Sequence, residues 1–208
     1  MKYNAQVSAK HYKKHEFDSL RIESITEQLK QICFSGYTNI LEIGTGSGFL
    51  GHCLGFFNRI NLTTADIAED LHPDYVCSVL NMPFKDNQFE LVLCCEVLEH
   101  LRLDDFLPAL KEIRRITRHK AIISLPDMTR HFGLAIRLGR YGFRFDWNQP
   151  RRCYAQKEYE FKGEHYWEIG YKNALPKDVI SEIKAAGFDI DRHFRLKRNL
   201  WHHFFLLK

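Results

Sequence analysis

The 208-residue sequence has no apolar run that could cross a membrane, since a span needs roughly 18 or more consecutive apolar residues. Its N-terminal residues lack the apolar core of a secretion signal. The six cysteines are scattered and form no C-x-x-C pair, so neither a disulfide framework nor a cysteine-rich zinc site is indicated. These absences predict a cytoplasmic protein without a membrane span.

The sequence also has little excess charge. A net charge of +4 at pH 7 is too small to require a nucleic-acid partner. The 45% hydrophobic and 27% charged residues are typical of a folded globular protein, and the length allows one domain with room for an insertion. We therefore expect a single domain over residues 1–208, with an N-terminal helical segment at residues 1–36.

Apolar periodicity predicts an alternation of helices and strands. An amphipathic helix is expected over residues 11–33, then a buried strand over 39–43, a turn, and an apolar helical segment over 49–57. Further strands are expected over residues 60–65, 75–80, 89–95, 120–125, 188–194 and 200–207, with one helix capped by Asp104 or Asp105 and running to Ile116, and another over 176–186. This order predicts an α/β sheet that is parallel for most of its length.

Residues 127–175 do not fit the alternation and are expected to form an insertion over the carboxyl edge of the sheet, where open α/β sheets bind ligands. Between Arg130 and Arg152 the insertion has six arginines against one acid, Asp146, a local balance of +5. The arginines are Arg130, Arg137, Arg140, Arg144, Arg151 and Arg152. The stretch is either a solvated basic face or a lid that binds an anionic acceptor.

The most informative segment runs from Glu42 to Gly48, Glu-Ile-Gly-Thr-Gly-Ser-Gly. Glycines at such a turn let backbone N–H groups approach a ligand closely. The pattern is G-x-G-x-G and not the dinucleotide fingerprint G-x-G-x-x-G, because Phe49 occupies the sixth place. It also lacks the lysine of a P-loop, so pyrophosphate and triphosphate cofactors are disfavoured.

This segment resembles the first motif of the class I S-adenosylmethionine-dependent methyltransferases, with Glu42 in the acidic place. The resemblance covers about residues 38–126 and includes Asn-Met-Pro-Phe at 81–84 and Val-Leu-Glu-His at 97–100, which are similar to the subgroup with ubiquinone-pathway enzymes. It implies a Rossmann-like, doubly wound, mostly parallel seven-stranded sheet with an antiparallel last strand. The insertion would then follow the fifth strand.

The resemblance implies that S-adenosylmethionine is the cofactor and that Asp66, at the end of the second strand, binds the ribose hydroxyls. A carboxylate suits a vicinal diol because each oxygen can accept one hydroxyl hydrogen bond. The other interpretation of Asp66 is a cap for the next helix. The implied cofactor-binding residues are Glu42, Gly44, Thr45, Gly46, Gly48, Asp66, Ile67, Ser78, Val79, Leu80 and Cys95. Ser78 and Val79 depart from the family, which often has Asp before the backbone that contacts adenine.

Glu96, Glu99 and His100 form E-x-x-E-H, which on a helix would place all three side chains near one face. This is similar to the Mg²⁺-binding segment of ubiquinone O-methyltransferases and small-RNA 2′-O-methyltransferases, with His165 as the further ligand. The segment therefore predicts a site for Mg²⁺ or another divalent metal. The other interpretation is a set of structural hydrogen bonds, as in metal-free relatives.

The resemblance implies methyl transfer to a small, lipid-linked or sugar-linked acceptor that carries negative charge. Such a displacement requires alignment and exclusion of water but no covalent enzyme residue. His165, His131 and His100 are the candidates for a base, and no catalytic residue is assigned among them. The alternatives are an RNA methyltransferase that uses a divalent metal, and a cofactor-binding partner subunit that does not catalyse.

Overall fold

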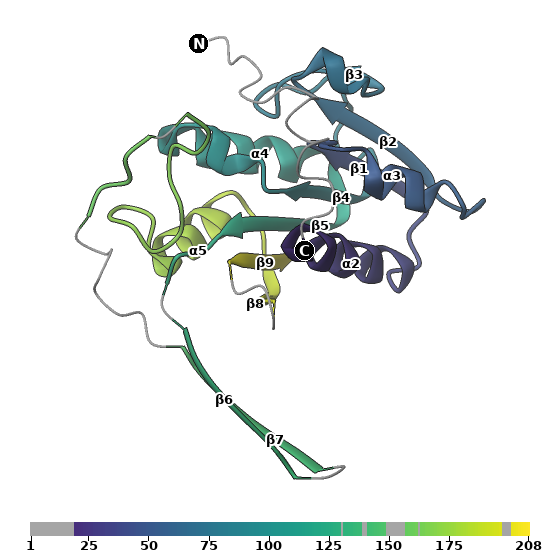
Figure 1. Cartoon of the computed structure of the whole chain (residues 1–208). Helices are drawn as coiled ribbons and strands as arrows, with labels where there is room; N and C mark the ends of the chain where they lie inside the picture. The colour runs from purple at the N-terminus through teal and green to yellow at the C-terminus, as the bar shows by residue number, and fades with distance from the viewer. Residues whose placement is uncertain (1–18, 130, 139–140, 149–156, 162, 197–200) are drawn as a thin grey trace.

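The computed structural model describes residues 19–129, 131–138, 141–148, 157–161, 163–196 and 201–208. Within these residues, seven strands form one sheet in the order β3-β2-β1-β4-β5-β9-β8 (Figure 1). The strands are β1 Asn39–Ile43, β2 Asn61–Asp66, β3 Tyr75–Val76, β4 Phe89–Cys95, β5 Thr117–Pro126, β8 Ile190–Arg195 and β9 His202–Leu207. The strands β1 to β5 are parallel, and β9 is antiparallel to β5 and β8. The predicted Rossmann-like sheet with an antiparallel last strand is confirmed.

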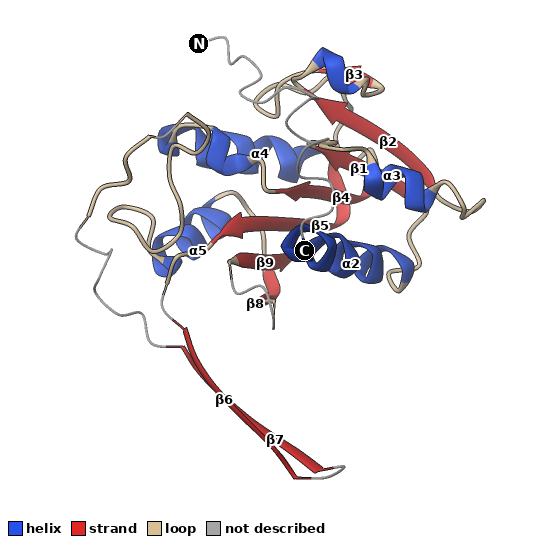
Figure 2. Ribbon diagram, viewed as in Figure 1, coloured by secondary structure: helices blue, strands red, loops and turns tan. Residues whose placement is uncertain are grey.

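Helices pack on both faces of the sheet (blue in Figure 2), which is why β1, β4 and the second half of β5 are mostly apolar and buried. One face is covered by α2 (Ser19–Cys33) and α3 (Phe49–Leu54), through Ile32, Leu50 and Leu54. The other is covered by α4 (Phe106–Ile116) and α5 (Pro176–Ala185). Single 3₁₀ turns lie at Glu69–Leu71, Leu98–His100 and Leu103–Asp105.

Most predicted elements are found, but the strand expected over residues 75–80 and the cap expected at Asp104 or Asp105 differ. The strand expected over residues 75–80 ends at Val76, because Leu80 N–H and Asn81 N–H donate to Ser78 and fold the chain into a turn. Asp105 precedes α4 but makes no capping hydrogen bond with its side chain. The reason is that the 3₁₀ turn ending at Asp105 leads directly into the helix.

The insertion divides into two parts. Strands β6 (His131–Leu138) and β7 (Tyr141–Asn148) pair as an antiparallel hairpin that projects away from the sheet (Figure 1). The returning segment, residues 163–175, instead joins the carboxyl edge, since Ile169 N–H donates to Pro126 O (2.9 Å) and Met128 N–H donates to Ile169 O (2.8 Å). Arg130, Arg140, Arg151 and Arg152, and the side chains of Arg137 and Arg144, lie outside what the structure describes.

Among the described helices, none is both long and apolar enough to span a membrane.

Candidate functional site

The glycine turn after β1 has a backbone that favours glycine at three places. Gly44, Gly46 and Gly48 have φ of +82°, +53° and +72°, in the left-handed region that L side chains rarely adopt. A Cβ at Gly44 would overlap Cγ2 of Val97. The turn and the segment after β4 therefore touch at Gly44, and a side chain there is excluded both by conformation and by space.

Asp66, at the end of β2, is hydrogen-bonded to the glycine turn. Thr45 N–H and Thr45 Oγ1 donate to Oδ2 at 2.8 and 3.3 Å, and Ala68 N–H donates to Oδ1 at 2.9 Å. The cap position of the following 3₁₀ turn is Ala68, so Asp66 is not simply its cap. Oδ1 keeps a second lone pair for one hydroxyl of a vicinal diol, and Oδ2 could accept from the other hydroxyl in place of the longer bond from Thr45 Oγ1.

Glu42 lies beneath the turn with 6% of its surface exposed. Its Oε2 has no hydrogen-bond partner among the described residues. Burial, with a smaller contribution from the charge of Asp66, raises the pKa of Glu42 to about 8. At neutral pH the group is therefore mostly protonated, and a positive charge at the turn would favour its ionisation.

The segment implied to contact adenine lies beside Asp66, because Cys77 N–H donates to Asp66 O (2.9 Å). Val79 is buried and Leu80 is half-buried against the core. The Ser78 hydroxyl oxygen accepts from Leu80 N–H (3.3 Å). Of the remaining cofactor predictions, Ile67 is 36% exposed directly after Asp66, and Cys95 ends β4.

Arg115, on α4, forms hydrogen bonds with the loop that contains Met82 and Phe84. The Arg115 guanidinium donates to Phe84 O (2.7 Å) and Met82 O (3.2 Å), and to both carboxylate oxygens of Glu112. Glu112 also accepts from Met82 N–H (2.8 Å). This network holds residues 82–84, which follow the segment that the resemblance implies for adenine, and the sequence analysis did not identify it.

The helix expected to carry Glu96, Glu99 and His100 is not formed, which corrects the predicted metal set. Glu96 has φ +55°, so the chain turns sharply after β4, and only the single 3₁₀ turn Leu98–His100 follows. The Glu96 carboxylate accepts from Ser124 Oγ (2.8 Å) and lies 3.3 Å from His202 Nδ1. Glu96 therefore does not join Glu99, His100 and His165.

Those three residues do converge, with one ligand-type atom from each lying within 4.8 Å of the others. Glu99 is fully buried, and neither of its carboxylate oxygens has a hydrogen-bond partner among the described residues. Burial, followed by the charge of Glu96, raises the pKa of Glu99 well above its usual value. Burial also lowers the pKa of His100, as does His165 beside it.

Hydrogen bonds fix the tautomers of both imidazoles. His100 Nδ1 lies 3.0 Å from Glu164 O, and His165 Nδ1 lies 2.9 Å from Glu168 Oε1, which also accepts from Tyr159 Oη (3.2 Å). Since both Nδ1 atoms face acceptors, we place the protons on Nδ1 and the lone pairs on Nε2. His165 Nε2 lies 4.0 Å from Glu99 Oε1. Glu168 was not predicted, although it lies in the same segment as His165.

A second group that the sequence analysis missed lies at the root of the insertion. The buried Asp127 accepts from His203 Nδ1 (2.8 Å) and Thr129 N–H (2.7 Å), while Arg195 donates to Asp127 O (2.9 Å) and Thr129 O (2.7 Å). Burial alone would raise the pKa of Asp127, but the bonds from His203 and Thr129 and the charge of Arg195 outweigh it and lower the pKa. His203 Nε2 lies 3.0 Å from His193 Nδ1. Asp127 directly follows β5, and an acid at the carboxyl end of a strand, like Asp66 at the end of β2, is a signal that could have found it.

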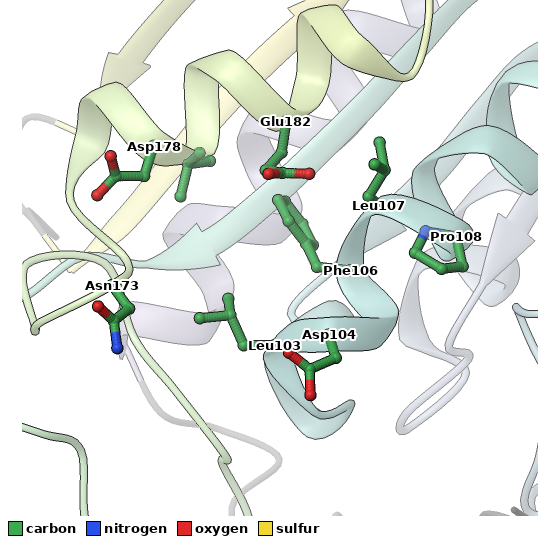
Figure 3. A pocket seen from close by; sticks show the side chains of 9 residues that line it. Leu103, Asp104, Phe106, Leu107, Pro108, Asn173, Asp178 and Glu182 are labelled. Atoms are coloured by element: carbon green, nitrogen blue, oxygen red, sulfur yellow. The ribbon is translucent and has the colours of Figure 1, made fainter.

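A groove of about 500 Å³ lies elsewhere, between the starts of α4 and α5 (Figure 3). Carboxylates line it around an apolar floor that includes Phe106, whose ring also packs against Trp167. Its residues are Leu103, Asp104, Phe106, Leu107, Pro108, Asn173, Asp178, Val179 and Glu182. None of them is a predicted site residue, so the groove is separate from the glycine turn.

The sheet order, the glycine turn and the acid at the end of β2 are together those of the class I methyltransferase fold. Residues 41–125 match the family model of a methyltransferase domain. Over these residues the chain is similar to a methyltransferase domain. An uncharacterized protein of Methanocaldococcus jannaschii, MJ0638, is 38% identical over 110 residues, covering 50% of this chain and 46% of that protein. The chain thus aligns with about half the length of this curated relative.

Solved structures agree on the fold. A SAM-dependent methyltransferase from Aquifex aeolicus has a TM-score of 0.59 at 16% identity, over 97% of this chain and 98% of that one. The 1,6-didemethyltoxoflavin-N1-methyltransferase of Burkholderia thailandensis, solved with S-adenosylhomocysteine, has a TM-score of 0.61 at 14% identity, over 96% of this chain and 85% of that one. At these sequence identities, similarity to the solved structures shows the fold alone. The acceptor has to be inferred from the residues of this chain.

Proposed function

We propose that the protein transfers a methyl group from S-adenosylmethionine to an acceptor bound at the carboxyl edge of the sheet. The observation that carries the proposal is the glycine turn held to Asp66 through Thr45 N–H, above the buried Glu42. The turn offers backbone close to a ligand, Asp66 Oδ1 keeps a lone pair for a ribose hydroxyl, and Glu42 has a buried oxygen without a hydrogen-bond partner among the described residues. These features fit the ribose and the positive charge of S-adenosylmethionine.

Calorimetric titration with S-adenosylmethionine tests the site. Asp66→Ala should raise the dissociation constant roughly 10- to 150-fold, because a charged hydrogen-bond partner contributes about 1.5 to 3 kcal/mol. Glu69→Ala is the matched control, since it removes an exposed carboxylate from the next turn and should leave the constant unchanged. Unchanged affinity in Asp66→Ala would remove Asp66 from the site, and tighter binding of NADH than of S-adenosylmethionine would overturn the assignment.

The acceptor in this proposal is a small, lipid-linked or sugar-linked molecule with negative charge, covered by residues 127–175 as a lid, and the reaction takes place in the cytoplasm. The position of the returning segment supports it, since Tyr166 N–H donates to Glu99 O (2.8 Å) beside the end of β4, and Phe161 stacks on Tyr166. Arg151 and Arg152 would bind the anion, so Arg151→Ala/Arg152→Ala should raise the acceptor KM while the cofactor dissociation constant stays within about twofold.

Tritium transfer from labelled S-adenosylmethionine into fractionated cell extract identifies the acceptor. Label in lipid, polysaccharide or anionic small molecules supports the proposal. Label in RNA would favour an RNA methyltransferase. Cofactor binding without transfer to any fraction would favour a partner subunit that does not catalyse. We also propose that the chain is related to the ubiquinone-pathway subgroup, and label in the lipid fraction would support this.

A second candidate is a divalent metal held by Glu99, His100 and His165. It is favoured by their convergence within 4.8 Å and by the Glu99 carboxylate, which no described residue bonds. Glu168 and Glu164 O would orient the two imidazoles from behind, as partners of metal-bound histidines commonly do. Two imidazoles favour zinc or iron over magnesium. Calorimetry with Zn²⁺ and Mg²⁺ should show binding that His165→Gln abolishes and His119→Gln retains, and equal binding by both variants would refute the site.

A further inference from the structure

Glu96 is held in an unusual conformation next to the glycine turn. Its φ of +55° is uncommon for a residue other than glycine, and such conformations persist where the surroundings fix them. Its N–H donates to Ser124 O (3.0 Å), which holds it to β5 just beyond the end of β4. The next residue, Val97, lies against Gly44. Glu96 is therefore one residue away from the turn that would bind the cofactor.

The Glu96 side chain links two other elements. Ser124 Oγ, on β5 and fully buried, donates to Glu96 Oε1 at 2.8 Å, and His202 Nδ1 lies 3.3 Å from the same oxygen. The side chains of Glu96 and His202 are 27% and 16% exposed, so the pair borders solvent without being open to it. A hydroxyl that orients a carboxylate, which in turn orients an imidazole, is the arrangement that prepares a base in many enzymes.

The topology places His202 at the carboxyl edge. Because β9 is antiparallel to β5, its first residue pairs with Pro126, the last residue of β5. His202 lies on the α2 face of the sheet with Phe204, whereas His203 lies on the opposite face with Phe205. The pair is thus distinct from the Asp127–His203 group and from His165, whose Nδ1 is bound to Glu168.

We propose that His202 is the proton acceptor for the methyl acceptor and that Glu96 is its positioning residue, an inference that rests on the proposed methyl transfer. The acceptor oxygen or nitrogen bonds to the methyl carbon while the methyl–sulfur bond breaks and leaves its electron pair on sulfur. His202 Nε2 takes the proton that the acceptor loses, and the negative charge of the Glu96 carboxylate, 3.3 Å from Nδ1, stabilises the imidazolium. The proton then passes to water, which restores the neutral imidazole.

The other titratable groups near Glu96 and His202 are less suited to accept the proton. Cys95 precedes Glu96, and burial keeps the pKa of its thiol above its ordinary value. Glu99 and His100 follow Glu96 in the same turn, and they belong to the group that includes His165. His203, next to His202, is bound to Asp127. His202 is thus the histidine whose imidazole faces Glu96.

The first test needs no acceptor. In a ¹⁵N–¹H long-range correlation spectrum of the full chain, His202 should be the Nδ1–H tautomer, because Glu96 faces Nδ1. In Glu96→Ala the His202 ring should shift toward the Nε2–H tautomer. The tautomer of His119, near the amino end of β5, should not change. An Nε2–H tautomer of His202 in the unsubstituted protein would overturn the inference.

The second test uses the extract fraction that accepts tritium from labelled S-adenosylmethionine. His202→Gln should lower the initial rate at saturating cofactor about 100-fold, the lower end for a lost general base, and Glu96→Gln about 10-fold. Both should keep the calorimetric dissociation constant of S-adenosylmethionine within about twofold, since neither removes a cofactor contact. His119→Gln is the matched control and should keep the full rate.

The outcomes separate the two proposals. An unchanged rate in His202→Gln overturns the base assignment and leaves the methyltransferase proposal standing. No label transfer by the unsubstituted protein to any fraction overturns both. If His202→Gln does not fold, as judged by lost cofactor binding, Glu96→Gln becomes the test of the base assignment. A lower rate at unchanged cofactor affinity in Glu96→Gln supports the assignment, because a purely structural role would not produce it. An unchanged rate overturns the assignment.

Discussion

Two buried carboxyl groups lie at the carboxyl edge of this sheet, Glu42 beneath the glycine turn and Asp127 at the root of the insertion. Glu42 has an oxygen without a partner among the described residues, and burial raises its pKa to about 8. Asp127 is equally buried, but His203, Thr129 and Arg195 surround it and lower its pKa. The same functional group is thus kept mostly protonated at one end of the edge and ionised at the other.

The difference separates the proposed cofactor site from a region whose contacts are structural. No described residue bonds Glu42 Oε2, and a positively charged ligand could stabilise the charged form of this group. Asp127 already has its partners, all of them from this chain, and they join β5 to β8, β9 and the first residues of the insertion. We therefore expect Asp127 to support stability and Glu42 to respond to the cofactor.

The largest effect should come from Asp127→Asn. Loss of one partner in a buried charged network should lower the free energy of unfolding by about 3 to 5 kcal/mol at pH 7. Because the folded-state pKa of Asp127 lies below its ordinary 3.8, this stabilisation is present above that pH and is lost as the pH falls through the folded pKa. Urea unfolding at pH 7 and at pH 3 measures it, and a loss below about 1 kcal/mol at pH 7 would contradict the structural role.

Gly44→Ala should cause the second-largest loss of stability. The left-handed backbone and the overlap with Val97 together should cost about 3 kcal/mol of stability. Gly36→Ala is the matched control, because Gly36 has a similar φ of +79° and an added methyl group there would have nothing within 4 Å, so it should cost about 1 kcal/mol. The double variant Gly44→Ala/Val97→Ala should recover part of the loss. Equal costs at Gly44 and Gly36 in thermal or urea unfolding would show that the contact with Val97 is unimportant.

The smallest effect, counted per pH unit, concerns Glu42. The folded protein keeps a proton on Glu42 that the unfolded chain loses, so stability should fall as the pH rises from about 4.5 to about 8. The slope should reach about 1.4 kcal/mol per pH unit within that window and should disappear in Glu42→Gln. At pH 7, S-adenosylmethionine should release a larger fraction of a proton on binding than S-adenosylhomocysteine, which lacks the sulfonium charge. Calorimetry in buffers of different ionisation enthalpy measures this, and equal release by the two ligands would argue against a charge effect at Glu42.

The turn region could be predicted from sequence because its residues are close along the chain. Glu42 to Gly48 are contiguous, and Asp66 ends the next strand, so alternation of strands and helices was enough to bring them together. The convergence of Glu99 with His165 was predicted only through the resemblance to a family. The contacts of His202 and His203 depend on the register of an antiparallel strand that returns from far along the chain. Apolar periodicity shows that such a strand exists, but it does not show which residue opposes which.

The helix predicted for E-x-x-E-H was wrong for a related reason. Spacings of three and four residues suit a helix, but the conformation of Glu96 is determined by its contacts with β5 and His202. The spacing of residues along the sequence gives no information about those tertiary contacts. The same tertiary contacts separate Glu96 from Glu99 and His100, so one sequence motif supplies two different groups.

Strand β9 begins with two adjacent histidines that lie on opposite faces of the sheet, one next to Glu96 and the other bound to Asp127. A slip of one residue would turn each imidazole to the other face and break both contacts at once. Evolution can therefore lengthen or shorten the connection before β9 only in ways that preserve its alignment with β5. Insertions and deletions accepted in descendants of this chain should leave the His-His pair opposite Pro126 and Leu125, even where the surrounding sequence diverges.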